Sequence, residues 1–190
     1  MKQILLIRHA KVDTDYDSTI YASDLKEWVE SYDVAPICDE SLPSEELREF
    51  VLDSNIVITS RLKRAIDSAQ VLNLTVDMQE AIFNEAEIPQ IAIPYLKLKP
   101  KSWFVVLRVW SLLGFGGKSV SLKASKLRAE RATMRLLELS TENEKVTLVG
   151  HGGMNWLMGK ELQKRGWRLE PNASMENWGM RVWRHNEKTS

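Results

Sequence analysis

The sequence predicts an α/β fold with a largely parallel central sheet, and three short apolar runs carry this prediction. Residues 4–7, 56–59 and 146–149 read ILLI, IVIT and VTLV. Runs of this kind predict strands that are buried on both faces, as in a parallel sheet covered by helices. Segments with helical spacing separate the runs, and strands that alternate with helices are typical of parallel α/β folds. We expect one domain over residues 1–190, a length sufficient for a substantial core.

Helix caps and turns order the first half of the chain. Ser23 predicts the start of a helix through Trp28, and Ser44 predicts the start of a shorter helix. After the strand at 56–59, a helix is expected to run to about residue 72. Residues 74–77 form a further strand candidate, followed by an irregular region punctuated by prolines.

The second half contains an apolar segment, a long helix and the last strands. Residues 103–115 are strongly apolar, and glycines end the segment. A helix is predicted over residues 121–140, with Ala124, Leu127, Met134 and Leu137 near one apolar stripe. The strand at 146–149 leads into another helix, and a last strand is predicted over residues 178–183.

Composition and charge place the chain among ordinary soluble globular proteins. The 26 basic and 26 acidic residues cancel, so nothing in the net charge favours nucleic acid as a partner. The single cysteine, Cys38, allows neither an internal disulfide nor a cysteine metal cluster. The chain begins directly with a strand and shows no signal peptide, so we expect a cytoplasmic protein.

The apolar segment at residues 103–115 has the composition of a membrane segment but not the length. It is shorter than the roughly 20 apolar residues that a span needs, and Arg108 lies within it. We therefore expect no stable membrane insertion and interpret the segment as a buried or lid helix. Attachment to a membrane surface is the alternative.

Polar residues follow each of the three buried strands. Arg8 and His9 end the first, Ser60 leads from the second towards Arg64, and His151 follows the third between glycines. Because ligands bind beyond the carboxyl ends of parallel strands, we expect these groups to converge. Two guanidinium groups, two imidazoles and the N-termini of the following helices would form an anion site, which suits a phosphoryl group best.

The residue types in this site predict a division of work. The arginines disfavour protonation of a neighbouring imidazole, so His9 would be neutral and nucleophilic towards phosphorus. Arg8, Arg64 and His151 would meet the charge on the phosphoryl oxygens. We assign Glu85 as the general acid for a leaving alkoxide and then as the base for water, with Glu80 and Glu87 as alternatives. No metal or cofactor is required, because side chains supply the positive charge.

Four short motifs resemble the signatures of the histidine phosphatase superfamily, which has the phosphoglycerate-mutase-like fold. In chain order they read IRHA at residues 7–10, SRLKRA at 60–65, FNE at 83–85 and VGHGG at 149–153. The resemblance implies a three-layer α/β/α sandwich and metal-independent hydrolysis or transfer of phosphate from a small phosphorylated substrate. It also implies that His9 is the phosphorylated nucleophile and Glu85 the proton donor, with Arg8, Arg64 and His151 forming the phosphate pocket.

Two departures from the family pattern bear on the reaction. Ala10 stands where the family usually has glycine, and Asp15 stands where mutases place an asparagine. An aspartate there would repel a second phosphate, which favours a phosphatase over a mutase-type phosphotransferase. A phosphohistidine-protein phosphatase, whose nitrogen leaving group needs less help from an acid, and a non-catalytic phosphate-binding module remain as alternatives.

By the same resemblance, a substrate cap is expected at about residues 87–118. An aromatic roof over the substrate would come from Trp103, Phe104, Trp110 and Phe115, which would predict a substrate with an apolar or aromatic part. The alternative is that these side chains pack onto the sheet or form the face of a homodimer.

Overall fold

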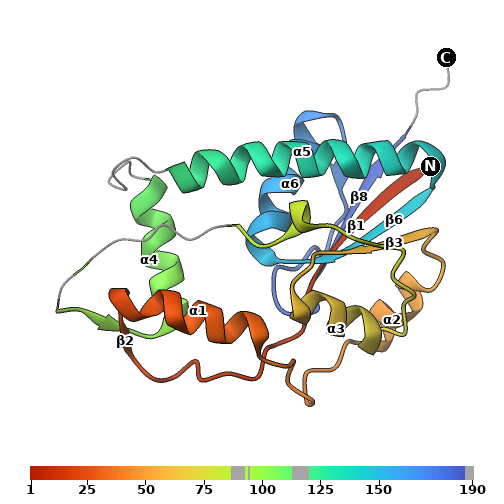
Figure 1. Cartoon of the computed structure of the whole chain (residues 1–190). Helices are drawn as coiled ribbons and strands as arrows, with labels where there is room; N and C mark the ends of the chain where they lie inside the picture. Colours follow the sequence, from red (N-terminus) through yellow and green to blue (C-terminus); the bar gives the residue numbers. More distant parts are fainter. Residues whose placement is uncertain (87–92, 94, 113–119, 187–190) are drawn as a thin grey trace.

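A six-stranded mixed sheet forms the centre of the computed structural model, which describes residues 1–86, 93, 95–112 and 120–186 (Figure 1). Its strand order is β4-β3-β6-β1-β8-β7. The strands are β1 (Lys2–Arg8), β3 (Ile56–Thr59), β4 (Met78–Gln79), β6 (Lys145–Gly150), β7 (Arg168–Leu169) and β8 (Met180–His185). The pairs β3–β4, β3–β6 and β6–β1 are parallel, whereas β8 pairs with both β1 and β7 in the antiparallel sense. The prediction of a mostly parallel sheet is therefore confirmed.

Helices cover both faces of this sheet. Alternate residues of β1 point to opposite faces, so that Ile4 and Leu6 lie in one apolar cluster and Leu5 and Ile7 in another. The first cluster includes residues of α5 (Val120–Glu142) and α6 (Gly152–Lys164), and the second includes residues of α2 (Glu45–Val51) and α3 (Lys63–Val71). This arrangement is the predicted three-layer α/β/α sandwich.

A third apolar cluster lies outside the sandwich and is called the outer cluster below. It contains α1 (Leu25–Val34), α4 (Pro100–Leu112) and the two-stranded sheet of β2 (Ile20–Tyr21) and β5 (Lys97–Leu98), together with the short helix η1 (Ala22–Asp24). Figure 1 shows α4 lying between the start of α5 and α1. This cluster combines residues 20–34, which the sequence analysis did not include, with part of the segment 87–118, whose role as a substrate cap stays a prediction. Residues 87–92, 94 and 113–118 lie outside the described residues.

The described helices include none that is both long and apolar enough to cross a membrane. The apolar segment that begins at Trp103 forms most of α4, and Trp103 and Leu107 are almost fully buried in the outer cluster. These two residues pack with Leu25.

Several local predictions differ from the structure. Ser44 accepts a hydrogen bond from the Leu47 N–H and caps α2 as predicted, but Ser23 does not cap α1, because its hydroxyl donates to the Asp24 carboxylate. The strand predicted at residues 74–77 is instead β4, a few residues later.

The predicted apolar stripe of α5 is wrong for Ala124, Leu127 and Met134, which are exposed, whereas Leu137 packs against the core. Leu127 and Met134 are half exposed, and the helix buries the small residues Ala129 and Ala132 with Leu136. Small side chains allow α5 to lie close to the sheet and to α6. The hydrophobic pattern of a single helix does not show how closely that helix packs against its neighbours.

Candidate active site

The ends of β1, β6 and β3 are level with one another. Arg8 lies opposite Gly150 in the β1–β6 ladder, and Thr59 lies opposite Val149 in the β3–β6 ladder. The residues that follow these strands, His9, His151 and Ser60, therefore emerge side by side. The predicted convergence of the strand ends is present.

His9 is a buried, neutral imidazole. Its side chain is 3% exposed, and its Nδ1 lies 2.6 Å from the carbonyl oxygen of Ala10. A carbonyl only accepts hydrogen bonds, so Nδ1 carries the proton and Nε2 carries the lone pair. Burial, followed by the positive charges of Arg64 and Arg8, lowers the pKa of His9 to about 3 despite an opposing effect of the Ala10 contact.

His151 stands next to His9, with ring centroids 5.2 Å apart. Its Nε2 lies 2.7 Å from the Ser60 hydroxyl, which also accepts the Leu62 N–H. If the Ser60 hydroxyl donates to Nε2, all three groups are satisfied and the ring proton lies on Nδ1. Burial, and then the neighbouring charge of Arg64, lower the pKa of His151 well below its ordinary value, so this ring is also neutral.

Arg64 is held in the site by two contacts with α1. This almost fully buried side chain from the first turn of α3 donates from Nη1 to the Asp33 carboxylate at 2.6 Å. Its guanidinium carbon also lies 4.6 Å from the centre of the Tyr32 ring. The sequence analysis missed both partners, because Asp33 and Tyr32 look like ordinary residues of an amphipathic helix.

Arg8 is held from the other end of the chain. Its Nη1 donates to the Met175 carbonyl at 2.8 Å, and the loop before β8 also supplies Asn177, whose amide donates to the His9 carbonyl at 2.9 Å. A Cβ at position 152 would lie in ordinary van der Waals contact with Arg8, 3.5 Å from its Nε, so the start of α6 packs directly against this side chain. No local sequence signal identifies Met175 and Asn177 as supports of the site.

Within this site, three buried side-chain nitrogen donors have no hydrogen-bond partner among the residues that the structure describes. They are Arg8 Nε, Arg64 Nε and His151 Nδ1, the last under the tautomer argued above. A buried donor without a partner costs free energy, and such groups in a native structure call for an explanation. Two of them carry positive charge, and their positions beside His9 suit the oxygens of a phosphoryl group.

Glu85 has a different setting from the one expected for a free acid. Its carboxylate accepts hydrogen bonds from the N–H groups of Gly153 at 3.2 Å, Met154 at 2.9 Å and Ala86 at 2.8 Å. Gly153 and Met154 belong to the first turn of α6, so Glu85 caps this helix and interacts favourably with its dipole.

The helix N-termini offer fewer free N–H groups to a phosphate than expected, because several N–H groups there already have partners. Glu85 occupies those of Gly153 and Met154 in α6. Before α3, the N–H groups of Arg61 and Leu62 donate to the side chains of Asn84 and Ser60. The anion site therefore depends on side chains more than the sequence predicted.

The aromatic ring next to His9 comes from α1 rather than from α4. Tyr32 meets the His9 ring edge-on with centroids 6.4 Å apart and stacks on Trp28 at 5.2 Å. Trp103 is buried in the outer cluster, and its indole N–H donates to the Ile20 carbonyl at 2.8 Å. This residue therefore packs in a core, which was the alternative to a place in the aromatic roof. Phe104 contacts Trp28 with ring centroids 5.7 Å apart. The side chains of Trp110 and Phe115 lie outside the described residues.

Comparison with solved structures identifies the class of fold. The chain resembles a phosphoserine phosphatase mutant from Entamoeba histolytica in complex with phosphoserine, with a TM-score of 0.60 and 14% identity over 96% of this chain and 90% of that one. It also resembles the product of an open reading frame of Mycobacterium tuberculosis, with a TM-score of 0.58 and 17% identity over 95% of this chain and 90% of that one. A third relative in structure is a mycobacterial glucosyl-3-phosphoglycerate phosphatase in complex with VO3, at a TM-score of 0.54 and 15% identity over 86% and 81% of the two chains.

These likenesses show that the chain shares the α/β fold of these phosphatase structures, the phosphoglycerate-mutase-like fold. No family model and no curated protein matches the sequence.

Proposed function

We propose that this protein is a phosphatase that hydrolyses a small phosphomonoester through a phosphohistidine intermediate on His9. One observation carries the proposal: the unprotonated Nε2 of His9 lies in a buried site with three donors, Arg8 Nε, Arg64 Nε and His151 Nδ1, that have no partner among the described residues. The names of two proteins with the same fold, a phosphoserine phosphatase and a glucosyl-3-phosphoglycerate phosphatase, also support it.

The first half of the reaction transfers the phosphoryl group to His9. The Nε2 lone pair forms a bond to phosphorus while the bond from phosphorus to the leaving oxygen breaks. Arg8, Arg64 and His151 stabilise the charge on the remaining phosphoryl oxygens. The leaving alkoxide takes a proton, which we assign to Glu85.

The second half restores the enzyme. Water attacks the phosphohistidine, its proton passes to the general base, and the P–N bond breaks with the electron pair returning to Nε2. Since His9 remains neutral over the ordinary pH range, it is ready for the next cycle without losing a proton to solvent.

A phosphohistidine phosphatase is the second candidate, and the setting of Glu85 favours it. The carboxylate is already engaged by three N–H groups, which suits a cap of α6 as well as a proton donor. A nitrogen leaving group would need less help from that acid.

The first experiment measures hydrolysis of an aryl phosphate in EDTA by the wild type and by His9→Ala. We expect turnover by the wild type and a loss of roughly 1,000-fold or more in the variant, because the nucleophile is removed. A matched control is His185→Ala, since His185 contacts Trp167 and none of the site residues. Equal turnover by His9→Ala and the wild type would show that the nucleophile is misassigned.

A second measurement separates the two candidates. If the wild type is inactive on aryl phosphates but dephosphorylates a phosphohistidine peptide, the second candidate replaces the first. Both mechanisms also predict an acid-labile phosphoenzyme, which radioactive substrate should label in the wild type but not in His9→Ala. If neither substrate labels the wild type in this way, both covalent mechanisms are wrong.

A further inference from the structure

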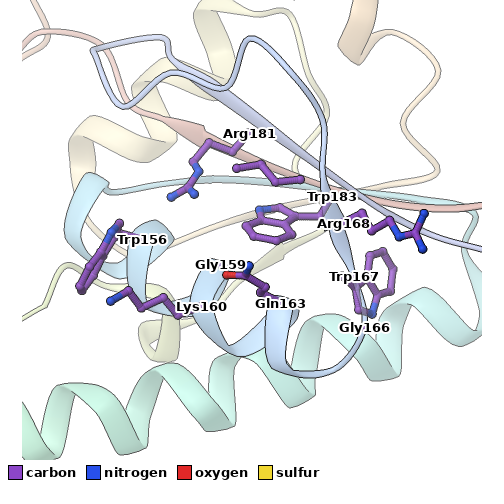
Figure 2. Close-up of a pocket in the computed structure, with 10 residues that line it drawn as sticks. Trp156, Gly159, Lys160, Gln163, Gly166, Trp167, Arg168, Arg181 and Trp183 are labelled. Atoms are coloured by element: carbon purple, nitrogen blue, oxygen red, sulfur yellow. The ribbon is translucent and has the colours of Figure 1, made fainter.

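A second cavity lies away from the strand ends, between α6 and strands β7 and β8 (Figure 2). It has a volume of about 650 Å³. Its lining residues include Trp156, Lys160, Arg181 and Trp183, and none of the proposed phosphate-binding residues. This volume lies within the range of roughly 300–1,000 Å³ that is typical of small-molecule sites.

Two indole rings form the aromatic part of the cavity. Trp183 is 2% exposed, and its Nε1 has no hydrogen-bond partner among the residues that the structure describes. A Cβ at Gly159 would lie 2.7 Å from this ring, so only glycine lets the indole approach α6 so closely. Trp156, on the same helix, is 40% exposed. The cavity thus combines a buried indole that can still donate a hydrogen bond with a more accessible one.

Lys160 and Arg181 supply positive charge without carboxylate partners in the described part of the chain. Lys160 Nζ lies 3.8 Å from the centre of the Trp156 ring. Arg181 donates from Nη1 to the thioether of Met175 at 3.3 Å, and a thioether is a weak acceptor. The guanidinium carbon of Arg181 lies 5.6 Å from the centre of the Trp183 ring.

Two neighbouring cations, by contrast, are paired with a carboxylate. On the same helix and just after it, Lys164 and Arg165 both bond to Glu161, at 2.5 Å and 2.6 Å. Arg181 is half-buried, and burial lowers its pKa, which is the consequence of holding a charge away from water without a counter-ion. An anion would relieve this cost.

We propose that this cavity is a binding site for a small planar aromatic anion. The ligand's ring would lie against the indoles of Trp156 and Trp183, and its anionic group would be met by Lys160, Arg181 and the Trp183 N–H. The size of the cavity favours a small molecule over a segment of protein. The proposal does not depend on the phosphatase assignment, because the two sites share no lining residue.

The test is a titration with 2-naphthoate, a planar aromatic carboxylate without phosphate, followed through the indole N–H signals in two-dimensional NMR. Trp156→Phe assigns one signal, and we expect the signals of Trp156 and Trp183 to shift together. Arg181→Gln and Lys160→Gln should each weaken binding about tenfold, the effect of losing one charge-assisted hydrogen bond. Lys160 is exposed, so its replacement tests the proposal even if Arg181→Gln fails to fold.

Three controls define the outcome. Arg131→Gln removes an exposed arginine of α5 outside the cavity and should bind as the wild type does, whereas the neutral 2-naphthamide should bind at least about tenfold more weakly than 2-naphthoate. Saturating inorganic phosphate should leave naphthoate binding unchanged.

The proposal is overturned if neither indole signal shifts at about 5 mM probe, a concentration above the Kd of roughly 1 mM that corresponds to weak binding. It is equally overturned if the two variants bind as tightly as the wild type, or if phosphate displaces the probe.

Discussion

At the scale of single residues, the chemical state of the site is set by a few hydrogen bonds. The Ala10 carbonyl fixes the proton of His9 on Nδ1, and the Ala10 N–H donates to the Ser68 hydroxyl at 2.8 Å. This turn is fully buried and held from both sides, and a methyl group fits where the family usually has glycine. Ala10 is therefore compatible with the buried position of His9, the proposed nucleophile.

Arg64 gives the first prediction at this scale. Arg64→Lys should lower kcat/KM for an aryl phosphate roughly 100-fold, because one ammonium group cannot reproduce the fork that bonds to Asp33 and leaves Nε for the phosphoryl group. Steady-state kinetics on the purified variant measure the effect. Arg61→Lys, an exposed neighbour in the same motif, is the matched control and should retain wild-type kinetics. A near-wild-type value for Arg64→Lys would mean that Arg64 contacts no part of the substrate.

At the scale of elements, α6 connects the two sites described above. His151 precedes its first turn, Glu85 caps that turn, and Gly159 and Lys160 line the second cavity. The helix thus has a polar, tightly bonded N-terminus at the strand ends and an aromatic surface further along. The N–H groups of Gly153 and Met154 in its first turn are bonded to Glu85 and are therefore not available to a phosphate.

Glu85 gives the prediction at this scale, because its two roles respond differently to substitution. Glu85→Gln keeps an oxygen that can accept the Met154 N–H, whereas Glu85→Ala removes the cap and should cost about 1 kcal/mol in the free energy of unfolding. If Glu85 is also the proton donor, both variants should lower kcat roughly 100-fold on an alkyl phosphate and much less on an aryl phosphate with a good leaving group.

Urea unfolding and kinetics on the two substrates measure these effects. Normal alkyl phosphate turnover by Glu85→Gln would show that Glu85 only caps α6 and would strengthen the phosphohistidine candidate.

At the scale of the whole molecule, burial of the two histidines couples stability to pH. The folded protein binds no proton at His9 until about pH 3, and the pKa of His151 is also well below its ordinary value of 6.5. In the unfolded chain both rings take up a proton near pH 6.5, so below this pH the unfolded state binds more protons and stability falls as the pH falls.

His9 should therefore remove about 1.4 kcal/mol of stability per pH unit between roughly pH 6 and pH 4, and His151 should act in the same direction. Urea unfolding of the wild type and His9→Ala across this range measures the difference, and the variant should show the shallower slope by about one proton. His185→Ala keeps both buried rings and should match the wild-type slope. Parallel slopes for His9→Ala and the wild type would mean that His9 is protonated in the folded protein.

The sequence by itself determined the order and type of the main elements and the convergence of His9, His151, Arg8 and Arg64. Apolar runs such as residues 4–7 and the polar residues directly after them are local features, and parallel pairing with level ends brings those residues together.

Only the tertiary structure decided which groups support the site. Asp33 and Tyr32 reach Arg64 from α1, Met175 reaches Arg8 from the loop before β8, and Glu85 is turned towards α6. These partners lie far apart in the sequence, and contacts between them depend on how side chains from different elements fill the same space. For the same reason the sequence pattern could not show that α5 buries Ala129 and Ala132 instead of Leu127 and Met134.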